Sequence, residues 1–219
     1  MRAGQARPRR GLAFVVSSPS GGGKTTVVRA LVRRMTGLRR SISVTTRLRR
    51  PGERSRVDYR FVSRDVFAQL RSHAKLLEWA RVHRAEYGTL REPLLEALAD
   101  GTDVILSLDV QGARAVRRRL HDQVVLIFLL PPSLRALQAR LVRRRTESPE
   151  AIRQRLEAAR NELRQLAVYD YAVVNRRVAQ AVKDVQAIVT AERVRLRNRT
   201  HAHAAIKQFT VQPSRRGSA

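Results

Sequence analysis

The chain has 219 residues, 43% of them hydrophobic, which suits one compact domain with a buried core and a smaller subdomain. It contains no cysteine, which excludes disulfides, cysteine-ligated zinc and a cysteine nucleophile, and makes a reducing cytoplasm the expected compartment. The formal net charge of +27 attracts polyanions. Since no stretch approaches the roughly 18 apolar residues of a membrane helix, we expect a soluble protein.

The positive charge is distributed unevenly. The first acidic residue is Glu53 and the last is Glu192, and four of the 45 basic residues are lysines. Two explanations stay open: a coding bias toward arginine on an ordinary solvated surface, or a selected affinity for nucleic acid or the ribosome. The basic tails at 1–10 and 198–219 are expected to be mobile and to give weak, nonspecific nucleic-acid affinity.

Strand and helix patterns alternate along the chain. In the N-terminal half we predict strands at 12–17, 42–45 and 59–62, a basic loop at 46–58, and helices at 24–35, 64–72 and 91–99. In the C-terminal half we predict strands at 103–110, 124–130 and 171–175, and helices at 112–120, 133–143, 149–167 and 178–197. Two continuous apolar strands separated by a helix, 103–110 and 124–130, are expected to pair in parallel. The fold class is therefore α/β, a parallel sheet with helices on both faces.

Residues 12–28 read LAFVVSSPSGGGKTTVV, an apolar strand, a glycine-rich turn and the start of a helix. Glycines let backbone N–H groups close around phosphate oxygens, Lys24 supplies a charge, and Thr25 offers a hydroxyl to Mg²⁺. The motif is matched at Gly23-Lys24-Thr25, although Ser18 stands at the position of its first glycine. The alternative is an ordinary glycine-rich turn. Strand, lysine and helix together favour a P-loop whose candidate ATP-binding residues are Ser18, Pro19, Ser20, Gly21, Gly22, Gly23, Lys24, Thr25 and Thr26.

Arg47 and Arg50 lie three residues apart in the loop after the second predicted strand. Two guanidinium groups, together with the hydroxyls of Ser43 and Tyr59, suit a dianionic phosphate. Arg49, between them, is expected to be solvated surface. A solvated basic loop is the alternative reading of the whole cluster.

Five segments resemble the guanylate kinase family: SVTTRLRRPGE from Ser43, DYRFV at 58–62, LLEWA at 76–80, EYGT at 86–89 and LDVQGA at 108–113. The resemblance covers about residues 12–195. It implies a P-loop nucleoside-triphosphate-binding sheet within a domain at 11–197, with a GMP-binding insert at about 42–98 and a lid at about 138–156. It also implies ATP- and Mg²⁺-dependent phosphorylation of GMP, and of dGMP, in purine nucleotide metabolism.

The resemblance assigns the guanine base to carboxylates at Glu78 and Asp109 and a hydroxyl at Thr89, with Tyr87 near the phosphate. Carboxylates suit guanine because its edge offers N1–H and N2–H donors, whereas adenine offers nearly the reverse. Taken alone, Glu78 is open to reading as a helix-surface acid, and Trp79 is expected in the core.

The remaining catalytic candidates lie in the lid. The resemblance implies that Arg144 and Arg155 close over the ATP phosphates, and that they act with Lys24 and Arg47 as the catalytic set. Asn175 is expected on the adenine side. Three departures from the family pattern stand out: Ser107 in place of an acidic residue, Arg145 in place of a lid glycine, and Arg176 with Arg177 in place of acids.

Three other functions are alternatives. A kinase of a phosphorylated sugar does not need Glu78 and Asp109 together with the SVTTRLRRPGE loop. A non-catalytic guanylate-kinase-like binding module typically lacks the P-loop, which is present here. An RNA-associated protein lacks support from an RNA-recognition motif or from aromatic residues, which make up 5% of the chain. Oligomeric state stays open.

Overall fold

The main sheet is parallel and five-stranded in the computed structural model, which describes residues 9–82, 85–143 and 148–195. Its order is β2 (Leu38–Arg40), β7 (Asp103–Ser107), β1 (Ala13–Ser17), β8 (Val124–Leu130) and β9 (Tyr171–Val174). The predicted α/β class is confirmed. The expected pairing of the two long apolar strands was wrong, because β1 lies between β7 and β8 and pairs with both. The short edge strand β2 was not predicted.

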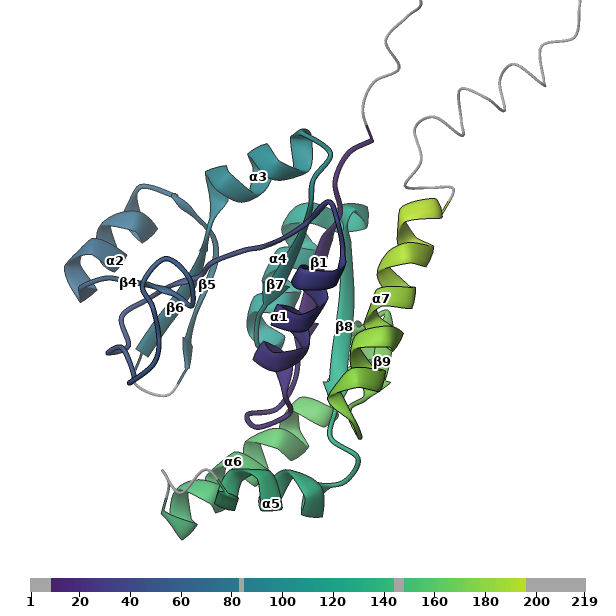
Figure 1. Cartoon of the computed structure of the whole chain (residues 1–219). Coiled ribbons are helices and arrows are strands. Elements are labelled where there is room, and N and C mark those ends of the chain that lie inside the picture. Colours follow the sequence, from purple (N-terminus) through teal and green to yellow (C-terminus); the bar gives the residue numbers. More distant parts are fainter. Residues whose placement is uncertain (1–8, 83–84, 144–147, 196–219) are drawn as a thin grey trace, which may run out of the picture.

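Helices cover both faces of this sheet (Figure 1). Alternation along β1 explains why: Phe14 and Val16 pack toward α1 (Lys24–Arg34) and α7 (Val178–Val194). Ala13 and Val15 pack toward α3 (Arg91–Ala99) and α4 (Val110–Leu120). Because β1 is the central strand of the sheet, the loop that follows it emerges at the centre of the carboxyl edge.

A second, four-stranded sheet lies beside the first. Its order is β4 (Arg60–Phe61), β3 (Val44–Thr45), β6 (Ala85–Leu90) and β5 (Leu76–Val82), and α2 (Arg64–Ser72) packs on it through Phe67. Sequence analysis missed β5 and β6. The alternating pattern of β5 is broken because Leu76, Leu77 and Glu78 are all buried around a register shift.

The helices α5 (Leu134–Arg143) and α6 (Pro149–Leu163) form a small unit beyond the carboxyl ends of the strands, next to the glycine-rich loop (Figure 1). Leu137, Leu141, Ile152 and Ala159 make its core. The predicted helix at 149–167 ends at Leu163, and a 3₁₀ turn (Leu166–Val168) follows. A second 3₁₀ turn (His121–Gln123) connects α4 to β8.

Both predicted tails lie almost entirely outside the described residues, at 1–8 and 196–219. Among the helices that the structure does describe, none is long and apolar enough for a membrane span.

Candidate active site

The loop between β1 and α1 has the geometry of a phosphate-binding loop. Gly21 and Gly23 have φ angles of 89° and 95°, which favour glycine. Gly22 is required for another reason: a Cβ there would lie 2.9 Å from the Cβ of Ser18 and 3.0 Å from the carbonyl oxygen of Pro19. The N–H of Gly22 closes the turn by donating to the carbonyl oxygen of Pro19 at 2.8 Å. The N–H groups in the first turn of α1, which have no acceptor within the helix, make this N-terminus suited to an anion.

Lys24 begins α1, and its ammonium group turns back to the end of β7. Nζ donates a hydrogen bond of 3.0 Å to the carbonyl oxygen of Leu108. Burial lowers the pKa of Lys24, while the charges of Asp109 and Glu162 act in the opposite direction. Lys24 is thus held where β7 and α6 meet the loop, within reach of phosphates that bind the loop N–H groups.

Asn175 connects the end of β9 to the loop. Its backbone N–H donates to the carbonyl oxygen of Leu130 and its Nδ2 to that of Gly22, both at 2.7 Å. Its Oδ1 is buried and has no hydrogen-bond partner within the described residues. A cavity of about 430 Å³ opens here, lined by Gly21, Gly23, Arg140, Arg143, Asn175 and Val178. Asn175 therefore ties the end of β9 to the glycine-rich loop beside this cavity.

The carboxylates of Glu78 and Asp109 converge from two different elements. Glu78 lies on β5 and accepts a 2.6 Å hydrogen bond from the hydroxyl of Thr89 on β6. Asp109 caps α4 by accepting from the N–H of Gly112 at 2.8 Å. A Cβ on Gly112 would lie 2.9 Å from Glu78 Oε2 and 3.3 Å from Asp109 Oδ1, so both acids border this glycine. Glu78 is buried on a strand, and the helix-surface alternative was wrong.

The charge state of Glu78 is tuned by its surroundings. Burial raises its pKa to about 7; the Thr89 hydroxyl lowers the pKa and the Asp109 charge raises it. A ligand that donates hydrogen bonds to this carboxylate favours its charged form. The paired acids therefore suit a donor edge such as that of guanine.

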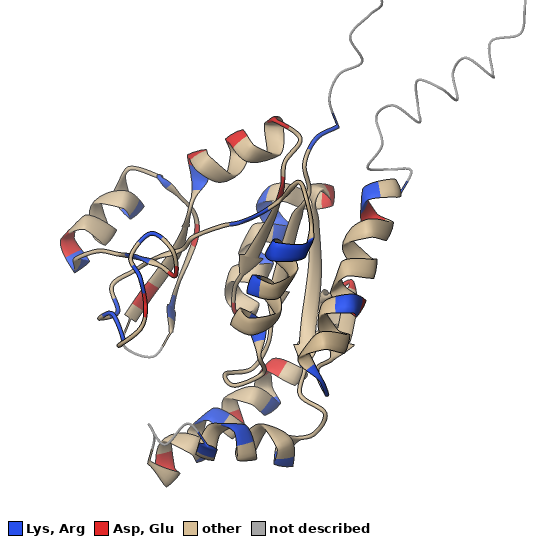
Figure 2. Cartoon of the chain, in the orientation of Figure 1, with Lys and Arg blue, Asp and Glu red and all other residues tan. Residues whose placement is uncertain are grey.

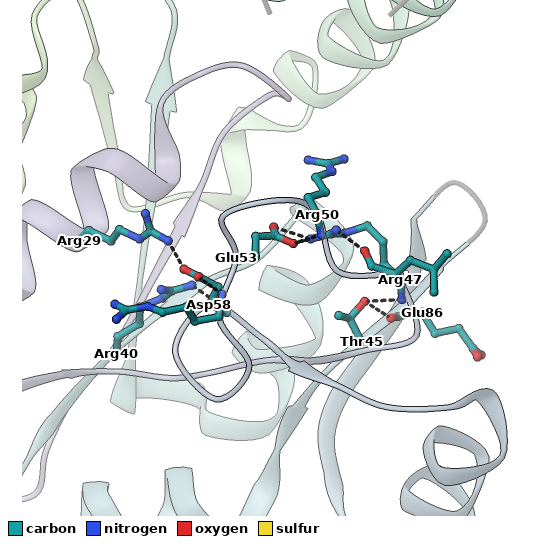
Figure 3. Close-up of polar contacts among 10 residues, drawn as sticks. Arg29, Arg40, Thr45, Arg47, Arg50, Glu53, Asp58 and Glu86 are labelled. Atoms are coloured by element: carbon teal, nitrogen blue, oxygen red, sulfur yellow. Dashed lines mark hydrogen bonds and ion pairs between the residues drawn. The ribbon is translucent and has the colours of Figure 1, made fainter. Parts of the chain in front are cut away.

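Arg47 is fully engaged in the loop between β3 and β4. Its Nη2 donates to both carboxylate oxygens of Glu53, at 2.7 and 3.0 Å, and its Nη1 donates to the carbonyl oxygen of Leu48 at 2.6 Å (Figure 3). Its guanidinium carbon lies 5.4 Å from the ring centre of Tyr59. Against the effect of burial, Glu53 raises the pKa of Arg47. The Glu53 carboxylate thus occupies a position beside Arg47 that suits an anion.

The other predicted phosphate ligands surround the same loop. The backbone N–H of Arg50 donates to Glu53 at 2.8 Å, and the Arg50 side chain projects away from the loop (Figure 3). The Tyr87 ring meets the Tyr59 ring edge-on at 6.0 Å. Ser43 is half-buried, and its carbonyl oxygen accepts from the N–H of Arg60 at 2.9 Å. Arg49 is exposed, as expected.

The α5–α6 unit touches the glycine-rich loop directly. A Cβ on Gly21 would lie 3.1 Å from Leu141 and 3.3 Å from Leu137. The guanidinium of Arg155 donates a hydrogen bond to the hydroxyl of Ser20. Arg155 therefore lies at the loop, whereas Arg144 and Arg145 lie outside the described residues.

Comparison with known proteins agrees with this geometry. The family model described as guanylate kinase matches residues 10–192. The chain belongs to the guanylate kinase family. It is 45% identical to a guanylate kinase of Rhodopseudomonas palustris strain BisB18 over 94% of both chains, and 47% identical to one of Bradyrhizobium diazoefficiens over 87% of both. The crystal structure of guanylate kinase from Anaplasma phagocytophilum superposes with a TM-score of 0.80 at 30% identity, covering 94% of this chain and 99% of that one.

The departures from the guanylate kinase pattern lie at the edges of the site. Ser107 ends β7, and its Oγ is buried without a hydrogen-bond partner among the described residues. Arg176 and Arg177 are exposed at the end of β9. Trp79 was expected in the core and is 44% exposed, with the Arg71 guanidinium carbon 4.9 Å from its ring centre. Because neighbouring strand residues face opposite ways, the inward turn of Glu78 sends Trp79 outward.

The residues around the loop fit a magnesium ion that is held mainly by nucleotide phosphates. Thr25 and Thr26 are exposed in the first turn of α1, and Ser107 offers a buried hydroxyl oxygen. No group of three or more histidine, cysteine or acidic side chains able to hold a metal occurs among the described residues. Mg²⁺ binds oxygen and is commonly held by one or two protein ligands together with substrate phosphates.

Three acidic residues of the site escaped sequence analysis. Glu53 lies in the SVTTRLRRPGE segment and Asp58 in the DYRFV segment. The arginines close to them in the sequence were the one indication that these acids form ion pairs. Glu162 had no such signal, because it comes from the far end of α6. Burial raises the pKa of Glu162 to about 7, while Lys24 lowers it and Asp109 raises it.

Proposed function

We propose that this chain performs its guanylate kinase reaction, ATP-dependent phosphorylation of GMP, where the main sheet meets the second sheet. One observation carries the proposal. Lys24 of the phosphate loop bonds to the carbonyl oxygen of Leu108, and Asp109, the next residue, stands beside Glu78 across Gly112. A donor-phosphate residue and a guanine-binding pair therefore adjoin at the end of β7. The enzyme class is phosphotransferase.

In this proposal the protein binds the acceptor, GMP, by both its guanine base and its phosphate. The insert at about 42–98 binds GMP: Glu78 and Asp109 accept from guanine N1–H and N2–H, and Thr89 contributes a hydroxyl. Arg47, Arg50, Ser43, Tyr59 and Tyr87 surround the GMP phosphate, with Arg47 exchanging its Glu53 partner for phosphate oxygens. A site whose buried carboxylates need donors leaves them unpaired against adenine, which discriminates by a factor of about 10⁴.

The donor lies on the glycine-rich loop. Loop N–H groups and Lys24 hold the β- and γ-phosphates, and Asn175 faces the adenine side. Thr25 would help to hold a Mg²⁺ ion, which would supply neutralisation of the phosphate charge when bound. A GMP phosphate oxygen forms the new bond to the γ-phosphorus, the bond from the γ-phosphorus to the β–γ bridging oxygen breaks, and ADP leaves. Arg155, with Arg144 of the lid at about 138–156, stabilises the migrating charge.

The protein acts mainly by positioning and neutralising, without a covalent intermediate. We also propose a cytoplasmic location and acceptance of dGMP. The predicted affinity of the basic tails for nucleic acid stays a prediction, since residues 1–8 and 198–219 lie outside the described residues.

Steady-state ADP release with ATP and Mg²⁺ tests the proposal against GMP, dGMP, AMP, CMP and UMP. We expect turnover with GMP alone among the ribonucleotides, and a loss of at least about 10²-fold in kcat on Lys24→Ala because a preorganised charge is removed. Equal turnover of AMP and GMP, or an unaffected Lys24→Ala variant, would contradict the assigned roles.

A further inference from the structure

Asp58 joins the second sheet to the main sheet just before β4. Its side chain is 6% exposed, and one carboxylate oxygen accepts a hydrogen bond from the guanidinium of Arg29 on α1 (Figure 3). The other oxygen accepts from the backbone N–H of Arg54 at 2.8 Å. Arg40 on β2 donates to the backbone oxygens of Asp58 and Val57, at 2.9 and 3.2 Å. Arg29 thus holds the carboxylate of Asp58, and Arg40 holds the backbone beside it.

Asp58 also shapes the turn that ends at Tyr59. Its N–H donates to the carbonyl oxygen of Arg54 at 2.9 Å, and the N–H of Arg56 donates to that of Tyr59 at 2.8 Å. Arg56 has a φ of 62°, which a non-glycine residue adopts only when surrounding contacts hold it. The carboxylate bond to the N–H of Arg54 closes this turn, and Tyr59 follows directly after it.

The Tyr59 ring in turn supports the proposed phosphate ligand. The Arg47 guanidinium lies over it at 5.4 Å and over the Phe61 ring at 5.7 Å. Arg29 stands on the same helix as Lys24, little more than one turn further along. Contacts therefore run without a gap from the donor-phosphate helix through Asp58 and Tyr59 to Arg47.

Charge strengthens this connection. The N–H of Arg54 lowers the pKa of Asp58; burial opposes this, and Arg29 and Arg40 lower the pKa further. Arg40 is half-buried, and its Nε has no hydrogen-bond partner among the described residues. A neutral side chain at 58 would leave two arginines facing one another without their counter-ion.

We propose that Asp58 is a positioning residue for the acceptor phosphate, and that it fixes Tyr59 and Arg47 relative to the phosphate-loop helix. The inference rests on the proposed function of Arg47 and Tyr59 as GMP ligands. Asp58 itself touches neither nucleotide. Its effect is transmitted to GMP and spares ATP.

The test compares Asp58→Asn, Arg29→Gln and their double variant. We expect KM for GMP to rise at least tenfold in Asp58→Asn while KM for ATP stays within twofold. The double variant is expected to be no worse than Asp58→Asn, since both changes break the same contact. Arg29→Lys, which keeps the charge, should recover part of the loss. Arg29 is nearly half exposed, so its variants test the contact even if Asp58→Asn folds poorly.

Asp103→Asn is the matched control. Like Asp58, Asp103 is a buried acid whose carboxylate accepts from arginine and from a backbone N–H, here from Arg9, Arg193 and the N–H of Leu12 at 2.7 to 2.8 Å. It lies at the opposite end of β7 from the phosphate loop. It should lower the melting temperature without changing the ratio of the two KM values. Equal shifts of both KM values in Asp58→Asn, or the same pattern in Asp103→Asn, would overturn the inference.

A binding readout separates this inference from the proposed function. The chain has one tryptophan, Trp79, directly after Glu78 on β5, and its fluorescence reports GMP binding without turnover. If the wild-type protein binds GMP but forms no GDP, the proposed function fails. The dissociation constants of GMP then still decide the inference: an unchanged value in both Asp58→Asn and Arg29→Gln overturns it, and a tenfold rise supports it.

Discussion

At the scale of single residues, the site combines groups whose charge depends on burial and neighbours. Lys24, Glu78 and Glu162 all have pKa values moved toward neutrality, each chiefly by burial. The ligand-free site is therefore less charged than its composition indicates. Binding of a phosphate or of guanine donors favours the charged forms, which couples substrate affinity to pH.

Glu78 gives the clearest pH prediction. With a pKa of about 7 in the free protein, its carboxylate is lost as the pH falls through 7, so KM for GMP should rise as the pH falls from 8 to 6. Stability has the opposite sign: the raised pKa means that the contribution of Glu78 to stability is present at low pH and is lost as the pH rises through about 7. KM measured from pH 5.5 to 8.5 checks the first statement.

Glu78→Gln is the control for that profile. It should raise KM for GMP at pH 8 and remove the step near pH 7. A second step, near pH 6, belongs to the phosphate of GMP and should persist in both proteins. A step near pH 7 that survives in Glu78→Gln would assign the titration to another group.

At the scale of elements, the helices and strands with the longest and most regular hydrophobic patterns were predicted best. The strand–loop–helix at 12–35 and the helices α2 and α3 were predicted almost to the residue, because each carries a continuous pattern or a capping residue such as Ser63. The strands β5 and β6 were missed because their burial depends on partners outside the segment. The part that their residues Glu78 and Thr89 play in the candidate site was indicated through the resemblance to the family.

The same reasoning explains which site contacts sequence analysis lacked. Lys24, Glu78 and Thr89 lie in recognisable sequence motifs. The neighbouring sequence does not indicate that Lys24 bonds to Leu108, or that Asp58 bonds to Arg29. The first contact spans 84 positions of the chain and depends on the strand order of the main sheet. The second spans 29 positions and depends on how the second sheet lies against the first. Arg47 was predicted as a phosphate ligand, while its partner Glu53 was noted only as part of a motif.

The geometry of the phosphate loop indicates that Gly22→Ala should strongly reduce activity with ATP. The added Cβ would meet Ser18 and the backbone oxygen of Pro19 at about 3 Å, so the loop must shift. Misplacement on the order of 1 Å costs about 10²-fold in rate, and we expect that loss in kcat/KM for ATP. Gly37→Ala is the control: its φ of 70° should cost roughly 1 kcal/mol of stability and leave ATP kinetics unchanged. Unchanged kinetics in Gly22→Ala would contradict the assignment of the loop.

At the scale of the whole molecule, arginines join distant parts of the chain. Lysines and arginines occur along the main-sheet helices, the second sheet and the α5–α6 unit alike (Figure 2). Several of them are structural: Arg29 and Arg40 hold the insert, and Arg9 and Arg193 hold Asp103. Part of the positive charge therefore serves the fold, whichever explanation of the arginine excess applies.

The contacts of Asp103 are expected to stabilise the whole fold. It is fully buried and ties the segment before β1 and the end of α7 to the start of β7. Asp103→Asn leaves two partly buried guanidinium groups without their acid, and we expect a loss of about 3 kcal/mol in the free energy of unfolding. Urea denaturation measures it. A loss below about 0.5 kcal/mol would show that solvent satisfies both arginines.

The measurement that tests the central claim most directly follows ³¹P resonances of the full chain mixed with ATP, Mg²⁺ and GMP. The account predicts that GDP and ADP appear in equal amounts, without inorganic phosphate, because Glu78 and Asp109 bring the GMP phosphate to the γ-phosphoryl group on the loop. Accumulation of inorganic phosphate with GMP unchanged would show transfer to water and contradict the account.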